Sequence, residues 1–193
     1  MRIIEGKDPI WETDKYDVIL VGTSIYCMLT NGFQSKIRFK YPNVDKENNK
    51  TPYGDKRKLG TRLTIYPIVD EQPTISLCYI ANYPNSKRVF VDYDALENVL
   101  ATANAEFKGE KVLTTLLGAS QFDGNGDIEK IKEIIEKNTK DLDIDVYVYE
   151  QIPRVDEIAY NENKLRKYRD KGGEENEQLW KNRDKILEKL YLK

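Results

Sequence analysis

Runs of apolar residues alternate along this chain with amphipathic stretches. Six short segments predict β-strands, at residues 2–4, 16–21, 62–68, 74–80, 111–117 and 144–150. Several are continuous apolar runs such as DVILV, which is typical of strands that are covered on both faces. The segment 144–150 alternates apolar and polar residues instead, so we expect it at a sheet edge or on a partly solvated face.

Amphipathic segments between these strands predict helices. The predicted helices span residues 33–41, 93–107 and 128–138. Pro42 ends the first, and Asp92 and Asp127 are suitable N-caps for the other two. The third is expected to bury four isoleucines, Ile128, Ile131, Ile134 and Ile135. Strands that alternate with helices predict an α/β fold, a three-layer α/β/α sandwich around a mostly parallel or mixed sheet.

The composition changes near the C-terminus. After Pro153 the sequence consists of two charge-rich helical patterns, at 154–171 and 174–193, separated by a Gly-Gly pair. We therefore expect a domain at residues 1–151 and a charged helical C-terminal extension at residues 152–193. The extension either packs as a helical hairpin on the domain or on a second subunit, or it is an arm that binds a partner. Residues 43–60 are polar and are expected to form a long surface connection, either without regular structure or with a helical turn.

The composition also excludes some chemistries. Among 193 residues there is no histidine, which removes Ser-His-Asp and Cys-His nucleophiles and almost every catalytic zinc site. The 31 basic and 33 acidic side chains nearly balance, which argues against a broad surface for binding duplex nucleic acid. No apolar run is long enough to span a membrane, and the N-terminus lacks a secretion signal, so we expect a cytoplasmic protein.

Both cysteines stand singly inside apolar runs. Cys27 and Cys78 are therefore expected to be buried free thiols. No basic residue adjoins Cys27 in the sequence, so we do not expect it to act as a nucleophile.

The stretch LLGASQFDGNGD, residues 116–127, raises the question of a metal site. Asp123, Asn125 and Asp127 have the first three ligand spacings of an EF-hand loop. The sixth position should be glycine and is Ile128, and the twelfth should be glutamate and is Ile134. Calcium is therefore rejected, and we expect neither a metal nor a cofactor.

A glycine-rich loop between a strand and a helix can instead hold an anion by its backbone N–H groups. Residues 118–127 form one such loop, and residues 22–33 form a second, after the strand at 16–21. Both are expected at the carboxyl edge of one sheet, where open α/β sheets bind ligands. The pattern favours a phosphate or nucleotide ligand.

The order of these motifs resembles the macrodomain family, which binds ADP-ribose, and within it the branch of DNA and protein ADP-ribose glycohydrolases. The segments that carry the likeness are IIEGKDPI at 3–10, DVILV at 17–21, MLTNGFQSKI at 28–37, FKYP at 39–42, KLGT at 58–61 and LLGAS at 116–120. The resemblance covers roughly residues 1–151. It implies that Asp8 reads the adenine amino group and that the two glycine-containing loops hold the distal ribose and the phosphates.

The sequence departs from the family pattern at the positions that carry the catalytic and ribose-binding residues. Gly22, Thr23 and Ser24 stand where the family usually has asparagines. The catalytic lysine of the branch would fall near Asn82-Tyr83, and Lys87 is a few residues later. The catalytic aspartate of the second loop has two candidates. Because Asp127 is the better helix cap, we assign any chemistry to Asp123.

The candidate catalytic residues are thus Asp123 and Lys87. The candidate ligand-binding residues are Asp8, Gly22, Thr23, Ser24, Thr30, Asn31, Gly32, Phe33, Gly118, Ala119, Ser120, Gln121, Phe122, Gly124, Asn125, Gly126 and Asp127. Some have a structural alternative: Asp8 can form a turn before Pro9, and Phe33 and Phe122 can be core residues. Tyr53 either belongs to a turn or folds over the crevice.

We therefore expect binding of ADP-ribose or a related adenine nucleotide. Hydrolysis is the open question: the enzyme would release ADP-ribose from protein or nucleic acid, or remove a terminal phosphate from an ADP-ribose phosphate. One alternative is a non-catalytic reader or sequestering protein for such nucleotides. Another is a structural or interaction protein that acts through its helical tail, by self-association or with a partner through residues 154–193.

Overall fold

The computed structural model describes residues 1–29, 32–68, 72–82, 89–120 and 124–148. Within them a six-stranded sheet has the order β1-β6-β5-β2-β4-β3. The strands are β1 (Arg2–Glu5), β2 (Val18–Ser24), β3 (Arg62–Ile65), β4 (Thr74–Ala81), β5 (Lys111–Thr115) and β6 (Asp143–Val148). Neighbouring strands are parallel except for β3, which pairs antiparallel with β4, so the sheet is mixed.

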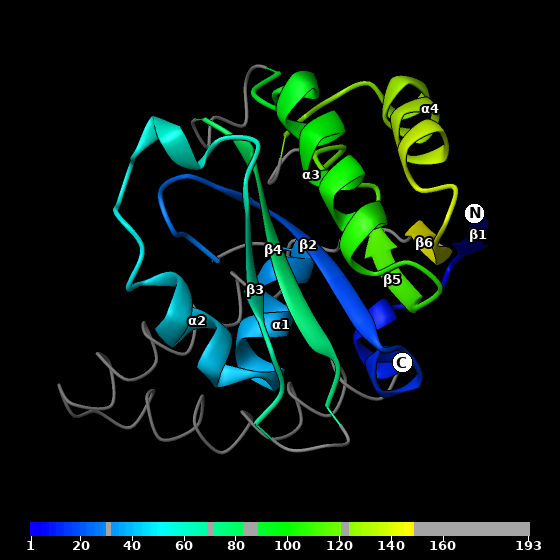
Figure 1. The fold of residues 1–193 in the computed structure, drawn as a ribbon, viewed down its shortest axis with the longest axis horizontal. Coiled ribbons are helices and arrows are strands. Elements are labelled where there is room, and N and C mark those ends of the chain that lie inside the picture. The colour runs from blue at the N-terminus through cyan, green and yellow to red at the C-terminus, as the bar shows by residue number, and fades with distance from the viewer. Residues whose placement is uncertain (30–31, 69–71, 83–88, 121–123, 149–193) are drawn as a thin grey trace, which may run out of the picture. The chain divides into compact units, whose positions relative to one another are not determined.

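Helices cover both faces of this sheet, which confirms the predicted three-layer α/β/α sandwich (Figure 1). The α-helices are α1 (Gly32–Lys40), α2 (Pro42–Asn48), α3 (Tyr93–Glu106) and α4 (Ile128–Asn138), and three single turns of 3₁₀ helix are η1 (Pro9–Trp11), η2 (Thr13–Lys15) and η3 (Lys56–Lys58). In Figure 1, α3 and α4 lie together on one side of the sheet, and α1 and α2 on the other. None of the helices in these ranges is long and apolar enough to cross a bilayer.

Strand β2 supplies both halves of the hydrophobic core. All seven of its residues are buried. Val18 and Leu20 join the cluster under α3 and α4, whereas Ile19 and Val21 join the cluster under α1 and α2. Side chains on a strand alternate between the two faces, so a central strand that is covered on both faces favours apolar residues at consecutive positions, as at residues 18–21. This explains the continuous run DVILV.

The prediction for the last strand was wrong in one respect. β6 lies between β1 and β5 inside the sheet, not at its edge, and four consecutive residues of it are buried. The polar residue that interrupts its apolar pattern, Asp145, is buried and accepts hydrogen bonds from Tyr16 Oη at 2.8 Å and Arg2 Nε at 2.6 Å. Partners supplied by other segments therefore compensate this carboxylate for the loss of water.

Two helix expectations also need correction. α4 begins and ends where predicted, but Ile128 in its first turn remains 49% exposed, while Ile131, Ile134 and Ile135 are buried as expected. The polar segment 43–60 contains more than the single helical turn allowed for it, because most of α2 lies in it, with Pro42 at the first turn of the helix. The predicted extension at 152–193 lies outside the described residues.

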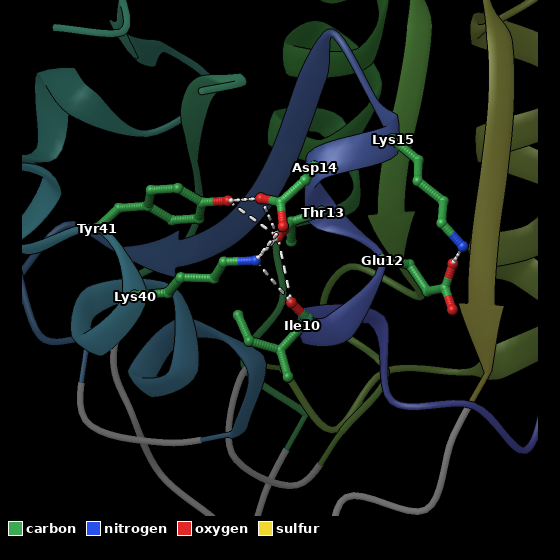
Figure 2. Close-up of polar contacts among 7 residues, drawn as sticks. All are labelled: Ile10, Glu12, Thr13, Asp14, Lys15, Lys40 and Tyr41. Carbon is green, nitrogen blue, oxygen red and sulfur yellow. Dashed lines mark hydrogen bonds and ion pairs between the residues drawn. The ribbon is translucent and has the colours of Figure 1, made fainter. Parts of the chain in front are cut away.

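A polar network ties the 3₁₀ turns to the end of α1 (Figure 2). Lys40 Nζ donates to the buried Thr13 Oγ1 at 2.6 Å, and Tyr41 Oη donates to the same atom at 2.9 Å. Thr13 in turn donates to Ile10 O at 3.1 Å. Burial raises the pKa of the Tyr41 phenol to about 12, so it stays a donor at neutral pH. The network fixes η1 and η2 beside α1.

The buried carboxylate of Asp145 gives a test of the fold. Burial alone raises its pKa, but the hydrogen bonds from Arg2 and Tyr16 and the charge of Arg2 outweigh this, and the net pKa lies below the ordinary value. The contribution of ionised Asp145 to the stability of the fold is therefore complete above pH ~4, and it is lost as the pH falls through the depressed folded-state pKa. We expect Asp145→Asn to reduce the unfolding free energy by about 1–3 kcal/mol at pH 7.

Urea unfolding at pH 7 and at pH 3 measures this effect, and the difference between wild type and Asp145→Asn should shrink at the lower pH. Asp143→Asn is the matched control, because Asp143 pairs with the same Arg2 at 3.0 Å but its side chain is 53% exposed. An exposed pair of this kind contributes about 0–1 kcal/mol. Equal effects of the two variants would contradict this account of β6.

Candidate functional site

The parallel strands β2, β4 and β5 end at one edge of the sheet. β2 pairs with β4 on one side and with β5 on the other, so their carboxyl ends point the same way. The segments that follow these strands, at 25–31, 82–92 and 116–127, therefore leave the sheet from neighbouring positions. In parallel α/β sheets this edge is where ligands bind.

Two of the predicted glycines meet on one side chain at this edge. A Cβ on Gly22 would lie 2.9 Å from Ile80 Cδ1, and a Cβ on Gly118 would lie 3.3 Å from the same atom. Gly118 has a φ of +81°, which L-residues with side chains rarely adopt, and its Cβ would lie 2.5 Å from Val91 Cγ2. The end of β2 and the segment after β5 thus both approach Ile80 of β4 at positions where neither has a side chain.

The loop from β5 to α4 folds back on itself. The Gly126 amide donates to Gly118 O at 2.8 Å. The amides of Gly124 and Asn125 both donate to Ser120 O, at 3.0 and 2.7 Å, and Asn125 has a left-handed φ of +49°. These three N–H groups therefore stabilise the loop itself. That this loop binds an anion stays a prediction.

Asp127 acts as a helix cap. Its Oδ1 accepts a hydrogen bond from Lys130 N at 2.9 Å, which confirms the predicted N-cap of α4. Its own amide donates to Tyr93 Oη at 2.9 Å, and Lys130 Nζ lies 3.8 Å from the centre of the Tyr93 ring. Asp127 is thus held by α3 and α4 together, and its amide does not point to a ligand.

Gly22, Thr23 and Ser24 are the last three residues of β2, not part of the following loop. All three are buried. Thr23 Oγ1 donates to Met28 O at 3.5 Å, and Ser24 Oγ accepts from Tyr26 N at 3.4 Å. These hydroxyls turn the chain out of the strand, which is the role that the structure gives them in place of the asparagines expected from the resemblance.

The start of α1 places two further candidates. Gly32 is the first residue of the helix and has a φ of +53°. Phe33 is buried in the hydrophobic cluster under α1 and α2, so the core alternative describes its position. Thr30 and Asn31 lie outside the described residues.

Asp8 precedes η1 beside α1. Its Oδ1 accepts from Ile10 N at 3.2 Å, which caps the 3₁₀ turn, and its Oδ2 forms an ion pair with Lys36 of α1. Both oxygens thus already have one partner. A carboxylate can accept more than one hydrogen bond at each oxygen, so an exocyclic amine can still be bound.

The remaining candidate residues lie in the loop after β5 and in segments that the structure does not describe. Ala119 donates its amide to Leu116 O at 3.0 Å, and Ser120 supplies the carbonyl oxygen described above. Gln121, Phe122, Asp123 and Lys87 lie outside the described residues. Within the described part of the chain, no three carboxylate, cysteine or histidine side chains form a group that could hold a metal ion.

A buried polar cluster lies behind the loop that follows β2, and no pattern in the sequence predicts it. Lys58 of η3 is buried, and its Nζ donates to Ile25 O at 3.1 Å, Thr51 Oγ1 at 2.7 Å and Cys27 Sγ at 2.9 Å. The same ammonium lies 4.2 Å from the centre of the Tyr79 ring. A charged residue followed by Leu-Gly carries no local signal of burial, so only the fold reveals it.

Asn48 completes this support. Its Nδ2 donates to Cys27 O at 2.9 Å, and its Oδ1 accepts from Tyr79 Oη at 2.8 Å. Burial raises the pKa of the Tyr79 phenol, so it remains a donor. Two carbonyl oxygens of the loop after β2, those of Ile25 and Cys27, are therefore fixed by side chains from α2 and η3.

Tyr53 lies against this loop. Its ring packs edge-on against Tyr26 at a centroid distance of 5.2 Å, and most of it remains exposed. The next residue, Gly54, has a φ of +68° and donates its amide to Ile25 O at 3.0 Å. Tyr53 thus belongs to a turn beside the loop after β2, which is the first of the two alternatives.

The close approach of Gly118 to Val91 gives a test of the site geometry. Gly118→Ala places a Cβ on a residue in the left-handed backbone region and brings that Cβ into a clash with Val91. We therefore expect this variant to lower the unfolding free energy by about 2–5 kcal/mol. Gly109→Ala is the matched control, because Gly109 has nearly the same φ, +84°, and nothing within 4 Å of its Cβ. The control should cost only about 1–2 kcal/mol.

Denaturant unfolding of both variants measures the difference. If Gly109→Ala is as destabilising as Gly118→Ala, close packing of Gly118 against Val91 is not what fixes the loop.

No protein-family model matches the sequence, and no curated protein matches it. Solved structures do. The macrodomain of Mycobacterium tuberculosis DarG is similar with a TM-score of 0.59 and 15% identity, over 75% of this chain and 96% of that one. Thermosipho africanus DarTG in complex with ADP-ribose has a TM-score of 0.60 and 14% identity, over 80% of this chain and 44% of that one.

A Trypanosoma brucei macrodomain in complex with ADP is similar with a TM-score of 0.55 and 12% identity, over 76% of this chain and 62% of that one. At these identities the likeness concerns the fold. The chain has the macrodomain fold.

Proposed function

We propose that this protein binds ADP-ribose or a related adenine nucleotide at the carboxyl edge of β2, β4 and β5. The observation that carries the proposal is the approach of Gly22 and Gly118 to Ile80, which brings the loops after β2 and β5 together. Two proteins of the same fold have ADP-ribose and ADP bound in their solved structures.

Hydrogen bonds within the two loops limit which backbone amides could bind a diphosphate. In the loop after β5, the amides of Ala119 and of residues 124–127 are already engaged, so we assign the proposed anion contacts to Gly118 and residues 121–123. In the loop after β2, we assign the proposed anion contacts to residues 28–33. Asp8, which lies beside α1, would accept the adenine amino group.

A finer proposal is hydrolysis at the distal ribose, which would release ADP-ribose from protein or nucleic acid, or removal of a terminal phosphate. Asp123 would orient the water or stabilise positive charge on the sugar, and Lys87 is the candidate cation. The support for this step is the resemblance of the sequence to the glycohydrolase branch.

Ligand binding is tested first by thermal unfolding of the full chain with ADP-ribose, ADP, NAD and ribose 5-phosphate. A ligand at about 100 times its dissociation constant adds about 2.7 kcal/mol of stability. We expect ADP-ribose and ADP to raise the melting temperature and ribose 5-phosphate to have a much smaller effect. No shift with any adenine nucleotide would contradict the proposal and favour the alternative of an interaction protein that works through its tail.

The role of Asp8 is tested by comparing two ion pairs on α1. Asp8→Ala removes the pair with Lys36, and Asp14→Ala removes the pair with Lys40. We expect Asp8→Ala to weaken ADP-ribose binding at least about tenfold, or ~1.4 kcal/mol, and Asp14→Ala to leave it unchanged. Calorimetric titration measures both. Equal affinities would remove Asp8 from the site.

Turnover separates an enzyme from a reader. With ADP-ribosylated protein and ADP-ribosylated DNA as substrates, we expect release of ADP-ribose by the wild type and none by Asp123→Ala. The variant should still bind ADP-ribose, because the aspartate acts on the reacting carbon and not on the diphosphate. Binding without turnover by the wild type would instead identify a non-catalytic reader.

A further inference from the structure

Cys27 and Lys58 form a contact that the proposed nucleotide site does not use. Lys58 Nζ lies 2.9 Å from Cys27 Sγ, although the two residues are 31 positions apart in the chain. The sequence showed no basic residue beside Cys27, and the fold supplies one. Thr51 Oγ1 lies 3.2 Å from the same sulfur and 2.7 Å from the same nitrogen, so three side chains converge.

The surroundings of Lys58 are unusual for an ammonium group. The residue is only 8% exposed. Its acceptors in the described part of the chain are the carbonyl oxygens of Ile25 and Pro52, the Thr51 hydroxyl and the Cys27 sulfur, and none of them is a carboxylate. Lysines are almost never buried without an ionic partner, because removing an ammonium group from water lowers the stability of the folded protein. The burial of Lys58 therefore suggests a role for its side-chain nitrogen.

The backbone of Cys27 is strained. Its φ is +58°, in the left-handed region that non-glycine residues rarely enter, and Asn48 holds its carbonyl oxygen at 2.9 Å. Strained residues that surrounding contacts hold in place often have a function. Here the conformation turns the sulfur toward the lysine nitrogen.

The second cysteine provides a contrast within the same chain. Cys78 is fully buried in the core, burial raises its pKa to about 12, and its sulfur donates to Ser76 O at 3.7 Å. Cys27 keeps 7% of its surface exposed and has a cation beside its sulfur. Although Cys27 is buried as well, a cation beside the sulfur is typical of reactive cysteines.

We propose that Cys27 and Lys58 are a site of oxidative cross-linking, in which a peroxide oxidises the thiol and the lysine amine captures the product. The inference does not depend on nucleotide binding. The cross-link would tie the loop after β2 covalently to η3, the turn that leads into β3.

The reaction balances in two steps. Hydrogen peroxide oxidises the Cys27 thiol to a sulfenic acid and is itself reduced to water. The neutral amine of Lys58, after its ammonium has given a proton to solvent, attacks the sulfur. An S–N bond forms, the S–O bond breaks, and water leaves. A second equivalent of peroxide inserts one oxygen between the sulfur and the nitrogen and is reduced to water, which gives the same cross-link one oxidation step further.

Intact mass spectrometry of the full chain after peroxide treatment tests the proposal. The S–N product is about 2 Da lighter than the reduced chain, and the oxygen-bridged product about 14 Da heavier. Trypsin does not cleave after a modified lysine, so the digest should contain residues 16–36 joined to residues 58–62. Treatment with a thiol should restore the separate peptides, the second then being cleaved after Lys58.

Three variants identify the groups involved. Cys27→Ser should abolish the cross-link, and Cys78→Ala should leave it unchanged. Lys58→Arg keeps a cation that can donate to the same oxygens, but a guanidinium that stays protonated is a poor nucleophile. In this variant the sulfenic acid should persist at Cys27 and be trapped by dimedone, with no cross-link.

The outcome that overturns the proposal is equally specific. It would be oxidation of the wild-type chain that yields only sulfinic or sulfonic acid at Cys27, a disulfide, or no change, with Lys58 cleaved by trypsin as in the reduced chain. A cross-link that survives in Cys27→Ser would assign the chemistry to other residues and would also overturn it.

Discussion

The candidate site depends on a backbone crossing that has no room for side chains. A Cβ on Gly124 would lie 2.1 Å from Gly118 O, and a Cβ on Gly126 would lie 2.7 Å from Val91 Cγ1. Because these positions are glycine, the loop after β5 can close on its own start, and Gly124 O can accept from the amides of Phe90 and Val91 at 2.9 and 3.1 Å. The crossing therefore also fixes the segment that leads from β4 into α3.

Local patterns were sufficient to predict the framework that carries this crossing. The first four residues of the central strand, 18–21, are all apolar because both faces of the strand are covered, and that property can be read directly from DVILV. The caps at Asp92 and Asp127 were predictable as well, since each carboxylate bonds to a backbone amide three residues ahead of it. The pairing of glycine-containing loops at one edge followed from the parallel order of the strands.

Features that depend on contacts distant in sequence could not be predicted in this way. Asp145 made β6 look like an edge strand, because its partner Tyr16 is 129 residues away and a pattern cannot identify it. Lys58 looked like a surface residue for the same reason. In both cases a polar side chain is buried and other segments satisfy it, so the hydrophobic pattern of its own segment is misleading. Ile128 gave the opposite error, an apolar residue left exposed in a first helical turn.

The support behind the loop after β2 constrains any ligand model further. The amides of Ile25 and Cys27 donate to Ala81 O and Ser24 O, and the carbonyl oxygens of the same two residues accept from Lys58 and Asn48. Residues 25–27 are therefore occupied on both sides of the backbone and act as a rigid base. An anion can then be held only by the part of the loop beyond this base, nearer to the start of α1, where a helix N-terminus favours negative charge. A ligand model with equal contacts along both loops does not fit these hydrogen bonds.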